Sequence, residues 1–261
     1  MFDSGFGGLT VARATIDLLP EEDLVYLGDS GRYPYGPRRQ DEVRGFARQI
    51  TRLLVEEHDV KLVVVACNTA AAAALDLLRA ETPVAVIGVI EPGVRSLVKA
   101  TETGRVAVIG TVGTIASGAY QKAVADTGAD VELTCAACPG FVEFVERGDT
   151  ASEQVHVLAE RLLAPVVAAG VDALLLGCTH YPYLARTITD VVGRDVVLVS
   201  SADETAFEIQ ALLASDGPAS PATPGRSGRH RFLSSGDPAR FVEVGFHLLG
   251  PELDHAERVE W

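Results

Sequence analysis

The chain has 261 residues and a formal net charge of −14 at pH 7, with 48% hydrophobic and 22% charged residues. This length suffices for two modest α/β domains or one large one, and the composition predicts a soluble globular protein. The acidic balance argues against direct binding of nucleic acid, whose phosphates it would repel. An acidic small substrate would have to be held by local hydroxyls, amides and backbone N–H groups.

Membrane and export signals are absent from the sequence pattern. The longest apolar run near a motif, Leu62 to Cys67, is far too short to cross a bilayer. No basic stretch followed by an apolar stretch opens the chain, so we expect a cytoplasmic protein without membrane contact. In that compartment the four cysteines are expected to be thiols rather than disulfides.

Short apolar runs alternate with helical patterns along the chain, which predicts βαβ units around parallel sheets covered by helices on both faces. The expected strands are Leu24–Leu27, Leu62–Ala66, Val84–Val89, Val106–Ile109, Ala173–Leu176 and Val196–Val199. The expected helices include Gln40–Glu57, Ala71–Arg79, Val155–Ala169 and Thr205–Leu213. Ser215–Arg229 is rich in Pro, Gly, Ser and Ala, which predicts a surface loop, and a further strand and helix are expected after it.

Two segments of the chain look alike. Residues 63–70 (VVVACNTA) and 174–182 (LLLGCTHYP) each run from an apolar strand through a small residue to a cysteine and a polar pair. FDSGFGG at the start has a loose counterpart in residues 108–114 (VIGTVGT). This self-similarity predicts two related α/β domains that face each other. We expect one domain to comprise residues 1–95 plus 207–261 and the other to comprise residues 96–206.

Polar residues follow the expected strands at their carboxyl ends, where parallel α/β sheets bind ligands. Two of them are cysteines, Cys67 and Cys178, in equivalent positions. A single cysteine there would most simply be a small buried filler. Two equivalent cysteines, each followed by hydrogen-bonding side chains and a helix start, instead favour reactive thiols.

Several other polar residues allow more than one interpretation. Asp3, before the glycine-rich turn DSGFGG, is either a turn-forming residue or a catalytic carboxylate, and the turn offers N–H groups to an anion. His180 is a general acid or base, a metal ligand or a packed side chain, and its place two residues after Cys178 favours a partner that sets the pKa of that thiol. The tyrosines of residues 33–36 (YPYG) either line a pocket or close a loop, and Glu146 faces either the site or solvent.

The remaining cysteines, Cys135 and Cys138, form a C-x-x-C pattern. A zinc site would need a second pair or histidines at suitable spacing, and a redox motif would need a helix to start after the first cysteine. The sequence has neither feature, so we interpret both cysteines as packing residues and expect no metal site.

The motifs of this chain resemble those of the glutamate racemase family, and the resemblance covers nearly the whole chain. FDSGFGG together with GCTHYP is specific to that family. The resemblance implies two pseudosymmetric α/β domains, each a mainly parallel sheet flanked by helices, with the active site in the cleft between them. The matching motifs are FDSGFGGLTV at the start, GD and PYG around Asp29 and Tyr35, ACNTA at Cys67, GVIEP at Gly88, CPGFVEFVE at Cys138, LGCTHYP at Cys178, SSADET near Asp203 and SGDP near Asp237.

In function, the resemblance implies an isomerase that interconverts L- and D-glutamate without a cofactor and supplies D-glutamate for peptidoglycan. The family's catalytic pair matches Cys67 and Cys178, with supporting acid–base roles for Asp3 beside Cys67 and for Glu146 and His180 beside Cys178. The FVEF segment before Glu146 departs from the apolar-Pro pattern of the family. The substrate-holding residues match Asp3, Ser4, Tyr35, Gly36, Asn68, Thr69, Thr179 and His180. A homodimer is expected, and DNA gyrase is a candidate partner by resemblance only.

Racemisation takes a proton from one face of Cα and returns one to the other, which a thiolate and a thiol on opposite faces can do. Pyridoxal phosphate, the common alternative, needs a Schiff-base lysine. Lys61 precedes its strand, and Lys99 and Lys122 lie in helical patterns away from the motifs, so no cofactor is expected. Two alternatives stay open: a racemase of a related amino acid such as aspartate, and a non-catalytic small-anion-binding or regulatory protein on the same scaffold.

The start of the chain departs from the family. Only Met1 and Phe2 precede Asp3, where family members usually carry several residues that form most of the first strand. We therefore expect a short first strand, an Asp3 close to a fraying terminus, and a marginally stable start.

Overall fold

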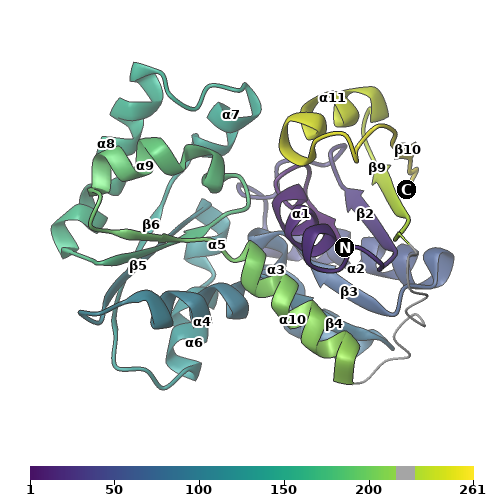
Figure 1. Ribbon diagram of the computed structural model, residues 1–261, viewed down its shortest axis with the longest axis horizontal. Coiled ribbons are helices and arrows are strands. Elements are labelled where there is room, and N and C mark those ends of the chain that lie inside the picture. Colours follow the sequence, from purple (N-terminus) through teal and green to yellow (C-terminus); the bar gives the residue numbers. More distant parts are fainter. Residues whose placement is uncertain (216–226) are drawn as a thin grey trace.

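The computed structural model describes residues 1–215 and 227–261 and contains two lobes side by side, each built on a parallel sheet (Figure 1). The first sheet has the strand order β10-β9-β2-β1-β3-β4, and the second has the order β6-β5-β7-β8. The strands of the first sheet are β1 (Phe2–Asp3), β2 (Leu24–Gly28), β3 (Leu62–Val65), β4 (Ala85–Gly88), β9 (His230–Ser234) and β10 (Glu257–Arg258). Those of the second are β5 (Arg105–Gly110), β6 (Glu132–Ala137), β7 (Ala173–Gly177) and β8 (Val197–Val199).

Helices flank both sheets (Figure 1). The helices of the part of the chain before β5 are α1 (Leu9–Leu18), α2 (Gln40–His58), α3 (Asn68–Glu81) and α4 (Ile90–Ala100). Those between β5 and β8 are α5 (Val112–Ala116), α6 (Ala119–Asp126), α7 (Phe141–Glu146), α8 (Glu153–Ala169), the 3-10 helix η1 (Tyr181–Leu184) and α9 (Ala185–Val192). After β8 follow α10 (Ala202–Ser215) and α11 (Pro238–Leu249). Within the described residues, none of these helices is long and apolar enough to cross a membrane.

The topology confirms the internal similarity that the sequence predicts. In the first sheet β1 lies between β2 and β3, with β4 beyond β3, and in the second β5 lies between β6 and β7, with β8 beyond β7. The two sheets therefore repeat one four-strand order, to which the last segment of the chain adds β9 and β10 at one edge. Cys67 follows β3 and Cys178 follows β7, so the two cysteines occupy corresponding places in the two lobes.

All six strands expected from the apolar runs are present, with ends shifted by no more than a residue or two. The short β1 and the edge strand β6 lack a continuous apolar run, which is why the pattern does not predict them. Helix α3 begins at Asn68 rather than at Ala71, because Cys67 caps it. The loop expected over Ser215–Arg229 lies largely outside the described residues, and Ser215 itself ends α10.

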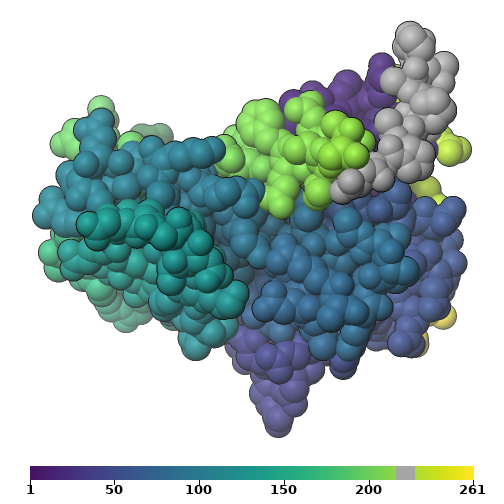
Figure 2. Space-filling view, turned by 90° about the horizontal axis from the view of Figure 1, so that it is seen from below, coloured from purple at the N-terminus to yellow at the C-terminus, as the bar shows by residue number. Residues whose placement is uncertain are grey.

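The two lobes share one apolar core on the side of α3 and α4. This core joins Val63 and Val65 of β3 to Val106 and Val108 of β5 in one continuous cluster of buried residues. Helix α10 carries the chain back to the first lobe and packs against both α1 and α4. Figure 2 shows α10, in green, at the surface beside the junction of the lobes. Shared packing of this kind fixes how the lobes face each other, and thus the geometry of any site between them.

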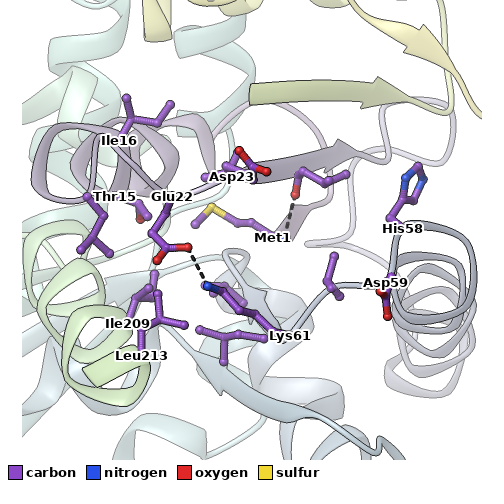
Figure 3. A pocket seen from close by; sticks show the side chains of 16 residues that line it. Met1, Thr15, Ile16, Glu22, Asp23, His58, Asp59, Lys61, Ile209 and Leu213 are labelled. Carbon is purple, nitrogen blue, oxygen red and sulfur yellow. Dashed lines mark hydrogen bonds and ion pairs between the residues drawn. The ribbon is translucent and has the colours of Figure 1, made fainter. Parts of the chain in front are cut away.

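The start of the chain is buried at the centre of the first sheet, so the expectation of a fraying terminus is wrong. Asp3 is only 1% exposed because β1 pairs with the ends of both β2 and β3. The amino group of Met1 donates to the Val25 carbonyl at 2.8 Å. Beyond Met1 a cavity of about 280 Å³ lies between β2 and β3, with the ion pair of Glu22 and Lys61 on its wall (Figure 3). Burial lowers the pKa of this amino group to about 5 from 8.0.

Adding three or four apolar residues before Met1 is expected to stabilise the protein. The unfolded chain binds the amino proton with the higher pKa, so the present fold loses stability as the pH falls from 8 towards 5. At pH 7 this loss is on the order of 1 kcal/mol, and relieving it should raise the melting temperature by about 2–4 °C. The pH dependence between 5 and 8 should flatten as well. An extended protein with the same melting temperature and the same pH dependence as the original chain would contradict the prediction.

Candidate active site

A small cavity lies between the two lobes, at the carboxyl ends of β1 and β3 of the first sheet and of β5 and β7 of the second. Its volume is about 120 Å³. Sites for drug-sized ligands measure roughly 300–1,000 Å³, so this cavity suits a substrate of the size of one amino acid. Every predicted site residue except Glu146 lines it: Asp3, Ser4, Tyr35, Gly36, Cys67, Asn68, Thr69, Cys178, Thr179 and His180.

Cys67 is held at the end of the cavity formed by the first lobe. It caps the N-terminus of α3, where its sulfur accepts a hydrogen bond from the Ala70 N–H at 3.5 Å, and its thiol donates to Ser4 Oγ at 3.7 Å. Burial raises the pKa of Cys67 well above its usual range, and the negative charge of Asp3 raises it further. These two effects outweigh the helix N-terminus, so Cys67 is a protonated thiol in the free protein.

Asp3 lies beside Cys67 with one carboxylate oxygen unused. Its Oδ2 accepts from the Gly5 N–H at 3.0 Å, while its Oδ1 is buried and has no hydrogen-bond partner among the described residues. Burial raises the pKa of Asp3, and the charge of His180 and the N–H groups of Gly5 and Gly8 counteract this rise. The free oxygen is an acceptor for a thiol or for an ammonium group placed in the cavity.

The second lobe surrounds its cysteine differently. His180 Nδ1 lies 3.9 Å from Cys178 Sγ, and His180 Nε2 lies 3.5 Å from Glu146 Oε1. Burial disfavours a charged imidazole, but the polar contacts with Cys178 and Glu146 prevail and raise the pKa of His180 to about 10. A protonated His180 stabilises negative charge on the neighbouring sulfur. Glu146 does not line the cavity but lies against His180, which does.

Neutral donors fill the rest of the polar lining. Asn68 Oδ1 accepts from the Tyr120 hydroxyl at 2.6 Å, which leaves its buried Nδ2 without a partner among the described residues. The Thr69 hydroxyl contacts those of Thr111 at 3.0 Å and Thr114 at 3.1 Å across the junction of the lobes. Amide and hydroxyl donors of this kind can hold a carboxylate without a cation. The part of the lining that the structure describes contains neither lysine nor arginine.

Tyr35 and Gly36 shape the cavity through their loop. The Tyr35 hydroxyl donates to the carboxylate of Asp29, so its proton is already used within the protein. The Gly36 carbonyl accepts from the Gly113 N–H of the second lobe at 3.1 Å. The loop therefore joins the lobes on one side of the cavity, and its ring and backbone rather than its hydroxyl contribute to the lining.

Sequence reasoning does not assign a site role to several side chains that line the cavity. Thr111 has a signal, since it follows the expected strand Val106–Ile109, and Tyr33 has one in the YPYG turn, but the others depend on folding of the second lobe over the first. They are Val112, Cys138, Val142, Glu143 and Tyr181.

Cys135 and Cys138 do not act together. Cys135 packs against the core shared by the lobes, whereas Cys138 belongs to the core on the other face of the second sheet. Residues three apart along a strand point to opposite faces, so the two sulfurs cannot form a common site. Within the described residues, no group of three or more His, Cys, Asp or Glu side chains is placed to hold a metal ion.

Gly7 is the point where the first lobe most closely approaches the second-lobe side of the cavity. A Cβ at this position would lie 2.3 Å from Thr179 Oγ1 and 2.5 Å from His180 Nδ1. We expect Gly7→Ala to lower kcat by about 100-fold, the cost of displacing a reacting group by about 1 Å. Gly45→Ala is the matched control, because nothing lies within 4 Å of a Cβ there. Equal turnover in the two variants would contradict this account.

Each of the two α/β lobes contributes one thiol to a shared cavity of the size of an amino acid. This arrangement is typical of proteins that exchange protons on both faces of a small substrate. The comparisons with known proteins agree with this class. The model of the Asp/Glu/hydantoin racemase family matches residues 10–208. A glutamate racemase from Acidothermus cellulolyticus is 50% identical over 98% of this chain and 96% of its own length.

Solved structures give the same result. A glutamate racemase isoform from Bacillus anthracis superposes with a TM-score of 0.92 at 40% identity, covering 99% of this chain and 96% of the other. A glutamate racemase from Francisella tularensis, solved in complex with D-glutamate, gives a TM-score of 0.90 at 32% identity with the same coverage. The chain therefore belongs to the Asp/Glu/hydantoin racemase family and, within it, to the glutamate racemases.

Proposed function

We propose that this protein interconverts L- and D-glutamate by a two-base mechanism and thereby supplies D-glutamate for peptidoglycan synthesis. The observation that carries the proposal is the pair Cys67 and Cys178, one from each lobe, on a single cavity of about 120 Å³. The D-glutamate complex of the Francisella tularensis relative supports glutamate as the substrate. The two catalytic units correspond to residues 1–95 plus 207–261 and residues 96–206, and the enzyme acts in the cytoplasm.

The different surroundings of the two sulfurs set their starting protonation states. Cys178, beside the protonated His180, is the thiolate that removes the Cα proton from one enantiomer of the substrate. Cys67, whose pKa burial raises, is the thiol that gives its proton to the opposite face of the resulting carbanion. After one turnover Cys178 holds the proton and Cys67 is the thiolate, which can remove the Cα proton from the other enantiomer. Asp3, whose negative charge favours the protonated form of Cys67, is the acid–base partner of Cys67 in that half of the cycle.

Substrate binding uses the polar atoms that have no partner among the described residues. The free oxygen of Asp3 accepts from the substrate ammonium group, and the free Asn68 Nδ2 donates to a carboxylate. Ser4, Thr69 and Thr179 supply further hydroxyl donors, and the Tyr35–Gly36 loop closes the cavity over the side chain. These neutral donors stabilise the carbanion-like state through fixed dipoles.

A homodimer and a contact with DNA gyrase remain proposals supported by family resemblance. Sedimentation of the purified protein, alone and with gyrase, tests both.

Circular dichroism of L-glutamate and L-aspartate after addition of the purified protein tests the proposed function directly. We expect the L-glutamate signal to decay to zero as the racemate forms, with L-aspartate unchanged, and the rate to survive dialysis against chelator. Decay of the aspartate signal alone would identify an aspartate racemase. Binding of glutamate without any decay would identify a non-catalytic binding protein.

A further inference from the structure

Tyr33 belongs to the first lobe but contacts the proton-transfer groups of the second. Its ring centroid lies 6.2 Å from that of His180 and 6.5 Å from that of Phe6. The ring also fills the space beside Gly5, where a Cβ would lie 3.0 Å from Tyr33 Cδ2. The first lobe thus fixes the ring on two sides and presents it to His180.

Three buried polar atoms near this contact have no hydrogen-bond partner among the described residues: Tyr33 Oη, Glu146 Oε1 and His180 Nε2. The last two lie 3.5 Å apart, longer than a good hydrogen bond. Unpaired buried polar atoms are costly, and a carboxylate between two donors satisfies all three at once. Burial and the neighbouring Glu146 raise the pKa of Tyr33, so the phenol keeps its proton and can donate it in a hydrogen bond.

We propose that Tyr33 is a positioning residue, whose hydroxyl donates a hydrogen bond across the cleft to Glu146 and so holds that carboxylate against His180. The proposal rests on the proposed racemase function and deepens it. Tyr33 does not touch the reacting sulfur. It acts through Glu146 and His180 on Cys178 and leaves Cys67, with its separate partner Asp3, unaffected.

The two enantiomers of 3-chloroglutamate report on the two cysteines separately, because each enantiomer loses its Cα proton to a different one. Removal of the Cα proton by one cysteine expels chloride from Cβ, and the resulting enamine tautomerises to an imine that water hydrolyses to 2-oxoglutarate and ammonium. The Cys67→Ser variant, which retains only Cys178, identifies the enantiomer that Cys178 deprotonates. The ratio of the elimination rates of the two enantiomers in one sample does not depend on how much of the protein is folded.

For Tyr33→Phe we expect elimination from the enantiomer that Cys178 deprotonates to slow by about 10-fold, which is the scale of one hydrogen bond to a charged group. Elimination from the other enantiomer should be unchanged. Glu146→Gln should slow elimination from the same enantiomer as Tyr33→Phe does. Adding Tyr33→Phe to it should cause no further loss, because the two residues act through one bond. Tyr183→Phe, a tyrosine outside the cavity, is the matched control and should leave the ratio unchanged.

Three outcomes would overturn the role of Tyr33: an unchanged ratio of the two elimination rates, equal slowing of elimination from both enantiomers, or rate losses that multiply in the double variant. Failure of the wild type to racemise glutamate would instead refute the proposed function, and that measurement is made first.

Discussion

Changing either Cys67 or Cys178 to Ser is expected to all but abolish racemisation of glutamate. A hydroxyl holds its proton far more tightly than a thiol does, so Ser cannot act as the base on its face of Cα. Proton transfer by a positioned group is worth ~10²–10⁴ in rate, and each single variant should lose at least that much. Cys135→Ser is the matched control, because Cys135 packs against the core shared by the lobes and does not line the cavity. Circular dichroism of L-glutamate measures all three variants.

Isotope and elimination measurements separate a two-base mechanism from other ways of losing activity. In deuterium oxide the wild type should place deuterium at Cα of the product, because the returning proton comes from a different sulfur than the one that took the first. Each single variant should still eliminate chloride from one enantiomer of 3-chloroglutamate, and the two variants should prefer opposite enantiomers. Near-normal racemisation in either variant, or the same preferred enantiomer in both, would refute the assignment of one cysteine to each face of Cα.

Replacing Asp29 by Ala should be the most damaging change outside the cavity. Its fully buried carboxylate accepts from Arg32 Nε at 2.7 Å, from Ser235 Oγ at 2.5 Å and from the Tyr35 hydroxyl. Removing it leaves a largely buried guanidinium and two hydroxyls without their acceptor, at a cost of about 3–5 kcal/mol in the free energy of unfolding. The KM for glutamate should rise as well, because Tyr35 loses the bond that fixes its loop.

Urea titration checks this prediction against Asp41→Ala. Asp41 also pairs with an arginine, Arg39, but both side chains are more than half exposed. An exposed pair of this kind contributes about 0–1 kcal/mol, so the control should unfold close to the wild type. If the two variants unfold at similar urea concentrations, the buried network around Asp29 is not the stabilising element inferred here.

Local patterns account for much of the fold. Runs such as Leu62–Ala66 indicate buried strands because several consecutive apolar side chains are needed only where helices cover both faces of a sheet. Parallel strands end at one edge of their sheet, so the polar residues that follow those runs converge. For this reason the pattern of residues is sufficient to pair Cys67 with Cys178 and to place Asn68 and Thr179 beside them.

The sequence by itself thus determined the strand pattern, the internal repeat and the meeting of Cys67 with Cys178, because these follow from periodicity and from the direction of parallel strands. Tertiary structure alone decided the rest. It set the burial that keeps Cys67 protonated, the contact that charges His180 beside Cys178, and the approach of Tyr33 to Glu146 from the opposite lobe. These properties depend on distances between segments remote in sequence and on exclusion of water, and neither quantity is encoded in the local pattern of residues.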